Sequence, residues 1–283
     1  MKLNQTQLAV AGFIIAALVF ACTDKTTTTP STTKNDPPST TTRSSGPPPL
    51  IPASTTATCA EQYFQGVAPT LINTKLATKA RRLCFSEYVI MHSGVTHTPL
   101  WAGEHLSAKK LLTDIDRKDN FHAEPALPAD ERSELADYAN SGYDRGHLAP
   151  AGDMPTVNAM SESFSLANMT PQNPTNNRGL WSSIESKTRD LATQRGDLYV
   201  VSGVIFSGSS IKRINNRVFV PTSYFKAIYD AKSGESGAYL VANNDSKDYK
   251  TVSIAEITKI AGIDPFPSIS ATSKNKVMTL PKP

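Results

Sequence analysis

Cysteine is scarce in this chain of 283 residues, and the signatures of several catalytic classes are missing. The three cysteines form no CxxC pair, and the five histidines contain no HExxH, so a zinc site has no support. Neither GxSxG nor a P-loop is present, which removes the support for an α/β-hydrolase and for a P-loop nucleotidase. No internal repeat is visible either, which argues against a repeat architecture.

The chain also lacks an apolar run long enough to span a bilayer as a helix, which takes about 20 residues. The run Leu8–Ala21, LAVAGFIIAALVFA, is shorter and suits the apolar core of a secretory signal. Ala21 directly precedes Cys22, which resembles a bacterial lipobox in which the cysteine is lipidated after cleavage. Phe20 is unusual at its position, so cleavage by ordinary signal peptidase is the alternative. We therefore expect residues 1–21 to direct export. The product is then either a lipoprotein anchored through Cys22, in the periplasm or at the cell surface, or a secreted protein.

Apolar residues are sparse in the segment that follows, residues 22–58, where Thr, Ser and Pro predominate. Such a composition cannot bury enough apolar surface to offset the entropy lost on ordering. We expect a disordered, extended tether here and one folded domain over residues 59–283. The net charge of +4 and the pI near 8.8 permit an anionic partner without demonstrating one.

If Cys22 carries lipid, Cys59 and Cys84 remain as a pair. An exported protein lies where disulfides persist, so we expect these two residues to be bonded. Two buried, unpaired thiols are the alternative.

The patterns in residues 59–283 predict a mixed α+β domain with antiparallel strands rather than a βαβ series. Strands are expected over Tyr88–His92, Leu198–Phe206, Arg217–Asp230 and Gly237–Asn244. Helices are expected over Asn177–Gln194, Ser161–Ala167 and Thr251–Asp264, the last with Gly262 as its cap.

One stretch, YDRGHLAPAGDM from Tyr143 to Met154, stands after a run that we read as strand-like. Downstream comes LANMTPQNPTNNRGLWSSIE, from Leu166 to Glu185, which places Asn177 30 residues after His147. Together these motifs resemble the DNA/RNA non-specific endonuclease family, and the likeness spans most of Tyr88–Asp230. The resemblance implies the ββα-metal fold: a central antiparallel sheet flanked by helices, with the site's histidine and asparagine on an adjacent strand and helix. It also implies phosphodiester hydrolysis in DNA and RNA with Mg²⁺, for which Mn²⁺ substitutes.

The resemblance assigns roles to four residues. His147 matches the general base, and a neutral imidazole can take a proton from water near pH 7. Asn177 matches the single protein ligand of the cation, which is reasonable because Mg²⁺ keeps several of its waters. Glu185 matches the acid that organises the metal's waters, and Arg117 an arginine that contacts phosphate.

Each of these residues also has an ordinary structural interpretation. His147 could be a buried hydrogen-bonding histidine, and Asn177 a helix N-cap. Glu185 could be a solvated helix residue paired with Arg189, four positions on. Arg117 could serve solubility only.

Asp144 and Arg145 complete the DRGH run, and we expect them to hold the loop around His147 rigid. Gly146 would then permit a turn or a close approach of the backbone. Direct binding of the cation by Asp144 is the alternative, since carboxylates suit hard cations.

The sequence therefore predicts a metal-dependent endonuclease that contacts DNA and RNA through the phosphate backbone. A catalytically inactive nucleic-acid-binding lipoprotein and a phosphodiesterase for small esters are the alternatives. The oligomeric state stays open.

Overall fold

The computed structural model describes residues 59–113 and 115–283. The expected signal peptide, the lipidation site at Cys22 and the tether at residues 22–58 lie outside the described residues. Within the described ranges, no helix is long and apolar enough to cross a membrane.

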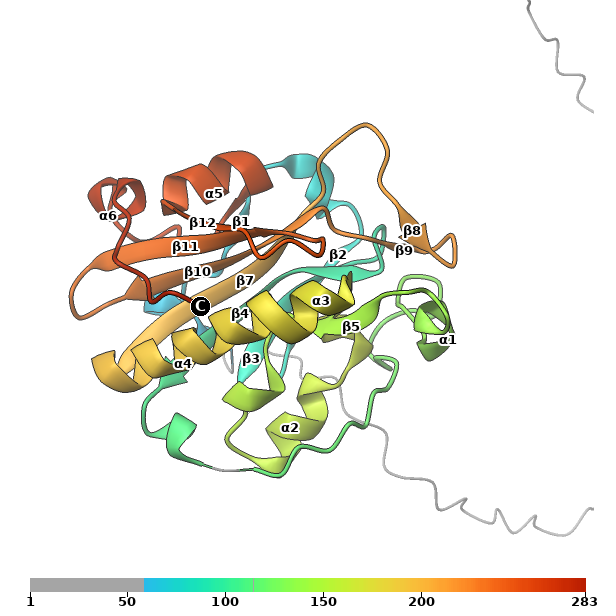
Figure 1. The fold of residues 1–283 in the computed structure, drawn as a ribbon, viewed down its shortest axis with the longest axis horizontal. Coiled ribbons are helices and arrows are strands. Elements are labelled where there is room, and N and C mark those ends of the chain that lie inside the picture. Colours follow the sequence, from blue (N-terminus) through green and yellow to red (C-terminus); the bar gives the residue numbers. More distant parts are fainter. Residues whose placement is uncertain (1–58, 114) are drawn as a thin grey trace, which may run out of the picture. The chain divides into compact units, whose positions relative to one another are not determined.

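The centre of the domain is a seven-stranded antiparallel sheet (Figure 1). Along the sheet the order is β12 (Tyr249–Val252), β11 (Glu235–Ala242), β10 (Ser223–Asp230), β7 (Asp197–Ile205), β4 (Thr98–Ser107), β3 (Tyr88–Ser93) and β2 (Ala80–Cys84). The expected strands at 88–92, 198–206 and 237–244 are confirmed within two residues at each end. The long strand expected over 217–230 is instead divided into β9 (Val218–Phe219) and β10. Pro221 lies between them and has no N–H with which to continue a ladder.

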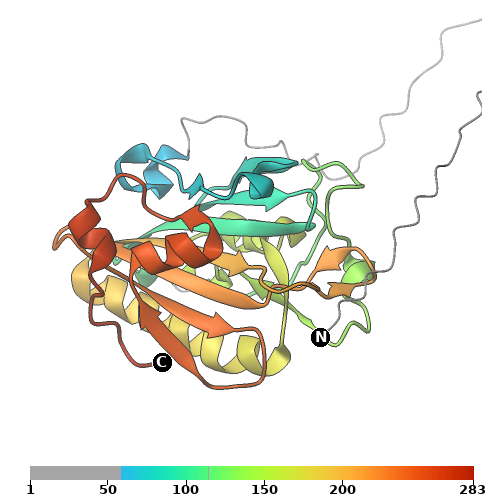
Figure 2. The same cartoon turned by 90° about the horizontal axis from the view of Figure 1, so that it is seen from above.

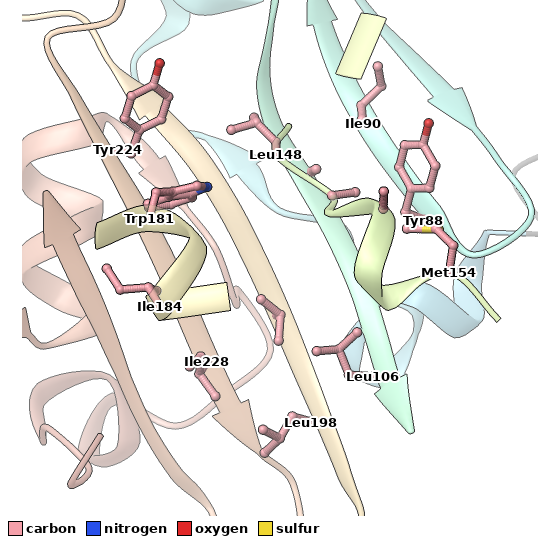
Figure 3. Close-up of a cluster of buried hydrophobic side chains, with 14 of the residues drawn as sticks. Tyr88, Ile90, Leu106, Leu148, Met154, Trp181, Ile184, Leu198, Tyr224 and Ile228 are labelled. Carbon is pink, nitrogen blue, oxygen red and sulfur yellow. The ribbon is translucent and has the colours of Figure 1, made fainter. Parts of the chain in front are cut away.

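Each face of the sheet is covered, which explains why its central strands are apolar on both sides. One face packs against the helix α4 (Ser182–Arg195) through a cluster that includes Trp181, Ile184 and Leu191. Figure 3 shows Trp181 and Ile184 in this cluster. The other face packs against α5 (Ile254–Ala261) and the first turn of the domain, around Tyr63. Figure 2 shows α5 and α4 on opposite sides of the sheet.

The second face also contains the disulfide between Cys59 and Cys84, whose Cα atoms are 5.9 Å apart. The expected pairing is therefore present in the structure. It ties the first turn of the domain to β2, an edge strand of the sheet.

A separate two-stranded ribbon lies on the α4 side of the sheet. Its strands are β5 (Asp144–His147) and β6 (Met169–Gln172), which pair antiparallel with His147 opposite Met169. Leu148 and Ala149, which follow β5, are fully buried in the cluster that also contains Trp181 and Ile184. The DRGH run is therefore itself a strand, whereas the sequence suggested a loop after one.

A continuous helical segment follows β6, and its start differs from the expectation at Asn177. It comprises α3 (Pro174–Asn176), the π-turn η7 (Asn177–Trp181) and α4. Asn173 is the N-cap, because its side chain accepts a hydrogen bond from the Asn176 N–H (3.2 Å). Asn177 is therefore not the N-cap, and its side chain is available for another role.

The remaining elements are short. The helix expected over Ser161–Ala167 is wrong: α2 covers Val157–Ser163, capped by Thr156 (Thr156 Oγ1 to Ala159 N, 3.1 Å). The late helix expected over Thr251–Asp264 is shorter: α5 covers Ile254–Ala261, because residues 251–252 and 263–264 lie in strands. Its cap is Gly262, as expected, in the left-handed conformation at φ 67°. The other strands and α-helices are β1 (Thr70–Leu71), α1 (Leu135–Tyr138), β8 (Arg213–Ile214), β13 (Ile263–Asp264) and α6 (Ala271–Asn275). Short 3-10 helices are η1 (Ala60–Gln62), η2 (Phe64–Gly66), η3 (Thr74–Ala77), η4 (Lys110–Leu112), η5 (Ala151–Asp153) and η6 (Leu166–Asn168).

Candidate active site

A cleft of about 700 Å³ opens beside the β5–β6 ribbon and the start of the long helix. Segment 115–121, β5, η5 and the helix residues 177–189 contribute to its walls. All six residues that the sequence singled out for the site line this cleft: Arg117, Asp144, Arg145, His147, Asn177 and Glu185. Residues more than 60 positions apart in the chain thus meet in one place.

His147 ends β5, and its ring lies edge-on to Phe164 with the centroids 5.1 Å apart. Its Nε2 is buried and has no hydrogen-bond partner among the described residues. Burial lowers the pKa of His147 to about 3, and the positive charge of Arg117 adds to this effect. The imidazole is therefore neutral near pH 7, with a ring nitrogen that no protein group occupies.

Asn177 and Asp144 form a hydrogen bond that orients the asparagine amide. Asn177 Nδ2 donates to Asp144 Oδ2 at 2.9 Å. Because the nitrogen of the amide is used here, its carbonyl oxygen is the end left for a ligand. An amide oxygen is a suitable ligand for a hard divalent cation.

Both carboxylate oxygens of Asp144 are occupied. Arg178 donates to them through two nitrogens, Nε to Oδ2 at 2.8 Å and Nη2 to Oδ1 at 2.7 Å. Burial alone would raise the pKa of Asp144, but the hydrogen bonds from Arg178 and Asn177 outweigh it and lower the pKa. The carboxylate is thus ionised and engaged with protein donors, which favours the positioning role over direct binding of a cation.

Gly146 is required by a close approach, not by a turn. A Cβ at this position would lie 2.6 Å from the Cβ of Gln172 on the paired strand. Gln172 is fully buried, and its Nε2 donates to Asn176 Oδ1 at 2.8 Å. The glycine therefore lets the β5–β6 ribbon pack against the start of the helix that presents Asn177.

Glu185 lies on α4 and faces the cleft from a partly buried position. Burial raises its pKa to about 7; the positive charge of Lys226 opposes this, and the negative charge of Asp153 adds to it. The pairing with Arg189 that the sequence suggested is not formed. Arg189 Nη1 instead donates to Asp153 Oδ1 at 2.9 Å.

Guanidinium groups surround the cleft, each near an aromatic ring or an acid. Arg117 is exposed; its Cζ lies 5.1 Å from the Phe164 ring centroid, and its Nε is 2.7 Å from Asp119 Oδ1. Arg145 stacks over Phe121, with Cζ 4.0 Å from the ring centroid. The Phe121 ring also lies near that of His147, with the centroids 6.0 Å apart, so this contact holds Arg145 close to His147.

Arg178 and Arg189 also line the cleft, and the sequence reasoning did not include them in the site. Arg178 directly follows Asn177, and Arg189 lies one helical turn beyond Glu185. Their positions on the same helix were the available signal, but exposed basic residues on helices are too common for that signal to be decisive.

The cleft combines a neutral histidine, an oriented amide oxygen, a carboxyl group and four guanidinium groups, a set whose chemistry suits an anionic ester. A family model described as DNA/RNA non-specific endonuclease matches residues 68–272. The chain therefore belongs to the DNA/RNA non-specific endonuclease family, as its motifs indicated.

Individual proteins of known sequence or structure agree with this membership. Nuclease C1 of Cunninghamella echinulata var. echinulata is 35% identical over 208 residues, which cover 66% of this chain and 82% of that protein. The mitochondrial nuclease EXOG of Danio rerio is 31% identical over 219 residues, or 69% of this chain and 64% of that protein. Human EXOG is 32% identical, and the match covers 59% of its length. The chain thus spans less than two thirds of these two EXOG proteins.

The fold also matches a solved structure, the crystal structure of the EndoG/EndoGI complex, which concerns the inhibition of EndoG. The TM-score is 0.64 at 27% sequence identity, over 73% of this chain and 96% of that one. The expected α+β, ββα-metal fold with a central antiparallel sheet is thereby confirmed.

Proposed function

We propose that this protein is a metal-dependent endonuclease that hydrolyses phosphodiester bonds in DNA and RNA without sequence preference. The observation that carries the proposal is the meeting, in one cleft, of an unpartnered His147 Nε2 and an Asn177 amide oriented by Asp144. Membership of the non-specific endonuclease family supports it.

In this proposal His147 is the general base that takes the proton from the attacking water. Its low pKa keeps the imidazole uncharged at neutral pH, so that one ring nitrogen is free to accept a proton. A bound phosphate places negative charge in the cleft, which raises that pKa toward the range that suits proton transfer. Arg117 and Arg145, which line the same cleft, neutralise phosphate charge and stabilise the charge that develops during attack.

The residues present fit a hydrated divalent cation. The described residues contain no group of three or more His, Cys, Asp or Glu that could hold a metal. A cation would therefore bind through the Asn177 carbonyl oxygen, with water in its other positions and Glu185 ordering those waters. Mg²⁺ suits this arrangement because it keeps several waters, and Mn²⁺ should substitute. When bound, the cation would neutralise phosphate charge and act as a Lewis acid.

The four guanidinium groups favour binding through the phosphate backbone. Contacts to phosphate and sugar carry no sequence information, so an arginine-lined cleft suits both DNA and RNA. Arg178 and Arg189 extend the set beyond Arg117 and Arg145 along the cleft.

The decisive test is digestion of supercoiled plasmid, long RNA and a small diester by the purified protein. We expect nicking of the plasmid and degradation of RNA with Mg²⁺ or Mn²⁺, and complete loss of both activities in EDTA. Binding of nucleic acid without cleavage in any metal would identify an inactive binding protein. Cleavage of the small diester alone would identify a phosphodiesterase for small esters.

We further propose that the protein is exported and anchored to a membrane by lipid on Cys22, with secretion as the alternative. The sequence of residues 8–22 supports this proposal. Intact-mass measurement of the protein from its native membrane fraction tests it. Lipidation predicts a diacylglyceryl adduct that Cys22→Ala abolishes, and a soluble product that starts elsewhere would show ordinary secretion.

A further inference from the structure

A cluster of buried charges lies behind Glu185, on the face of the sheet that packs against α4. Three neighbouring strands contribute to it: Glu104 on β4, Ser202 on β7 and Lys226 on β10. The register pairs Glu104 with Val200 and Ser202 with Lys226, which places all three side chains on the α4 face. Val200 belongs to the cluster packed against α4, which confirms that these side chains lie on the α4 side of the sheet.

In the part of the chain that the structure describes, the carboxyl group of Glu104 is the one in this cluster that has no hydrogen bond to offset the cost of its burial. It is 1% exposed, and neither Oε1 nor Oε2 has a hydrogen-bond partner among the described residues. An ionised carboxylate that is buried without donors is costly, whereas the protonated form carries no net charge to desolvate. The opposite strand presents only Tyr88 to Glu104, and that hydroxyl already donates to the Glu162 carbonyl (2.7 Å).

Other charged groups face Glu104 from each element around it. Asp153 approaches from η5, Glu185 and Arg189 from α4, and Lys226 from β10. Lys226 is also 1% exposed; its Nζ donates to Ser202 Oγ at 2.7 Å and lies 5.5 Å from the Trp181 ring centroid.

The charges in this cluster do not balance when all groups are ionised. Three carboxyl groups, those of Glu104, Asp153 and Glu185, face two cations, Lys226 and Arg189. One proton would bring the cluster to neutrality. Asp153 accepts a hydrogen bond from Arg189, and Glu185 borders the cleft, so Glu104 is the carboxyl group that burial disfavours most in the ionised form.

We propose that Glu104 carries this proton at neutral pH, and that Glu104 and Lys226 thereby act as positioning residues that allow Glu185 to ionise at the cleft. The protonation of Glu104 stands on the geometry alone. Its consequence for Glu185 rests on the proposed nuclease function.

The first experiment measures thermal stability against pH and needs no enzymatic activity. Burial raises the pKa of Glu104 well above its usual value. A group with a raised folded-state pKa stabilises the protein below its unfolded pKa, and this contribution is lost as the pH rises toward the folded value. Relative to Glu104→Gln, which never ionises, the unaltered protein should therefore lose Tm as the pH rises from about 4.5 to 8.

The Tm difference between Glu104→Gln and the unaltered protein should grow in favour of the variant across this pH range. The exposed Glu61→Gln is the matched control, and its difference should stay flat. A difference that shrinks with rising pH would show that Glu104 is ionised and would overturn the proposal. Glu104→Met provides a second neutral side chain of similar length in case glutamine does not fold. Infrared spectroscopy gives a direct reading: the protonated-carboxyl absorption at pH 7 should fall by one group in either variant, and an absorption unchanged in both contradicts the assignment.

The second experiment concerns Lys226 and uses the acidic limb of the kcat/KM profile. This limb is the pH range in which kcat/KM falls as Glu185 becomes protonated. Lys226→Met leaves one cation against three carboxyl groups, so a second proton should bind and the limb should move up by about 1 pH unit. Lys226→Arg keeps the charge and should restore the original position. An unmoved limb in Lys226→Met overturns the link to Glu185. Absence of activity from the unaltered protein would contradict the proposed function, and the Tm measurement would still decide the state of Glu104.

Discussion

At the scale of single residues, the pKa values of His147 and Glu185 in the cleft are in the reverse of their usual order. A histidine ordinarily titrates above a glutamate, but here burial lowers the pKa of His147 to about 3 and raises that of Glu185 to about 7. The cause is the same for both, because burial disfavours whichever form is charged. Environments that push two groups apart in this way are typical of acid–base sites.

Replacement of His147 tests the general base. We expect His147→Ala to lose at least about 10²-fold in kcat, since general bases contribute about 10²–10⁴-fold. Folding and metal binding should be largely retained. His122→Ala is the matched control, because His122 does not line the cleft and its Nδ1 contacts the Asn120 carbonyl. Near-normal plasmid nicking by His147→Ala would remove this residue from the role.

The pH dependence of cleavage should report Glu185 and not His147. The ionised form of Glu185 is lost as the pH falls through about 7, so the rate should fall there, while His147 stays unprotonated down to about pH 3. The kcat/KM profile of Glu185→Gln should be lower and should lack this acidic limb. A limb that persists unchanged in that variant would assign the titration to another group.

At the scale of elements, the β5–β6 ribbon and the start of the long helix form one unit. Asp144 on β5 holds Asn177 and Arg178, and Gln172 on β6 holds Asn176. The helix passes through a π-turn at Asn177–Trp181, a distortion that is frequent at functional sites. The side chains of the cleft are therefore set by contacts between the strands and the helix.

Substitutions of Asn177 and Asp144 distinguish the residue that binds the cation from the residue that positions it. Asn177→Ala should abolish the response to Mg²⁺ and reduce activity severely, because the amide oxygen is lost. Asp144→Asn should retain a weakened response and lower the Tm, since the ion pair with Arg178 is broken. Cleavage measured across a Mg²⁺ titration distinguishes them, and the reverse ranking would make Asp144 the ligand.

The neighbouring Asn176 serves poorly as a neutral control for Asn177. We expect Asn176→Ala to cost little activity. The residue is 1% exposed, however, and its side chain bonds to Gln172 and to the Ala242 carbonyl (3.3 Å). Its removal should therefore lower stability, so activity has to be compared well below the Tm.

Gly146→Ala tests the packing between the ribbon and the helix. The added methyl group meets Gln172, so we expect a loss of about 1–3 kcal/mol in the free energy of unfolding. Urea denaturation measures this loss. In a double-mutant cycle, Gln172→Ala should relieve part of the cost, and strictly additive effects would show that the two residues do not clash.

At the scale of the whole molecule, the disulfide and the cleft lie on different faces of the sheet. Cys59 and Cys84 belong to the cluster beneath α5, whereas His147 and Glu185 lie on the α4 side. Stability and chemistry can therefore be altered separately.

Reduction of the disulfide should lower the Tm and leave the cleft intact. Closing a loop of 25 residues contributes about 3 kcal/mol in the chain-entropy description, or about 6–12 °C for a domain of this size. Calorimetry of Cys84→Ser against the unaltered protein measures the change. Thiol counting in denatured, unreduced protein should find no free thiol at Cys59 or Cys84, and two reactive thiols there would contradict the bridge.

The sequence by itself determined the residue types of the site and their order along the chain. His147, Asn177, Glu185 and Arg117 could be chosen because hydrolysis of a phosphate ester needs a base, a cation ligand and positive charge, and because the motif spacing fits one family. The strong strands and the glycine cap of α5 were also readable, since short apolar runs rich in β-branched and aromatic residues and a capping glycine are local properties.

Only the tertiary structure decided how these residues are supported. The short strand β5 carries no local signal, because its residues do not alternate between apolar and polar. Its partners also lie 22 to 28 positions further along the chain, from His147 with Met169 to Asp144 with Gln172. From the sequence, Asp144 could bind the cation or position other residues. In the structure, Arg178 donates hydrogen bonds to both of its carboxylate oxygens, which favours the positioning role. Glu104 and Lys226 each read as an ordinary strand residue. Their burial beside Glu185 follows from the order of strands in the sheet. That order is set by pairing between distant segments, and the local sequence does not encode it.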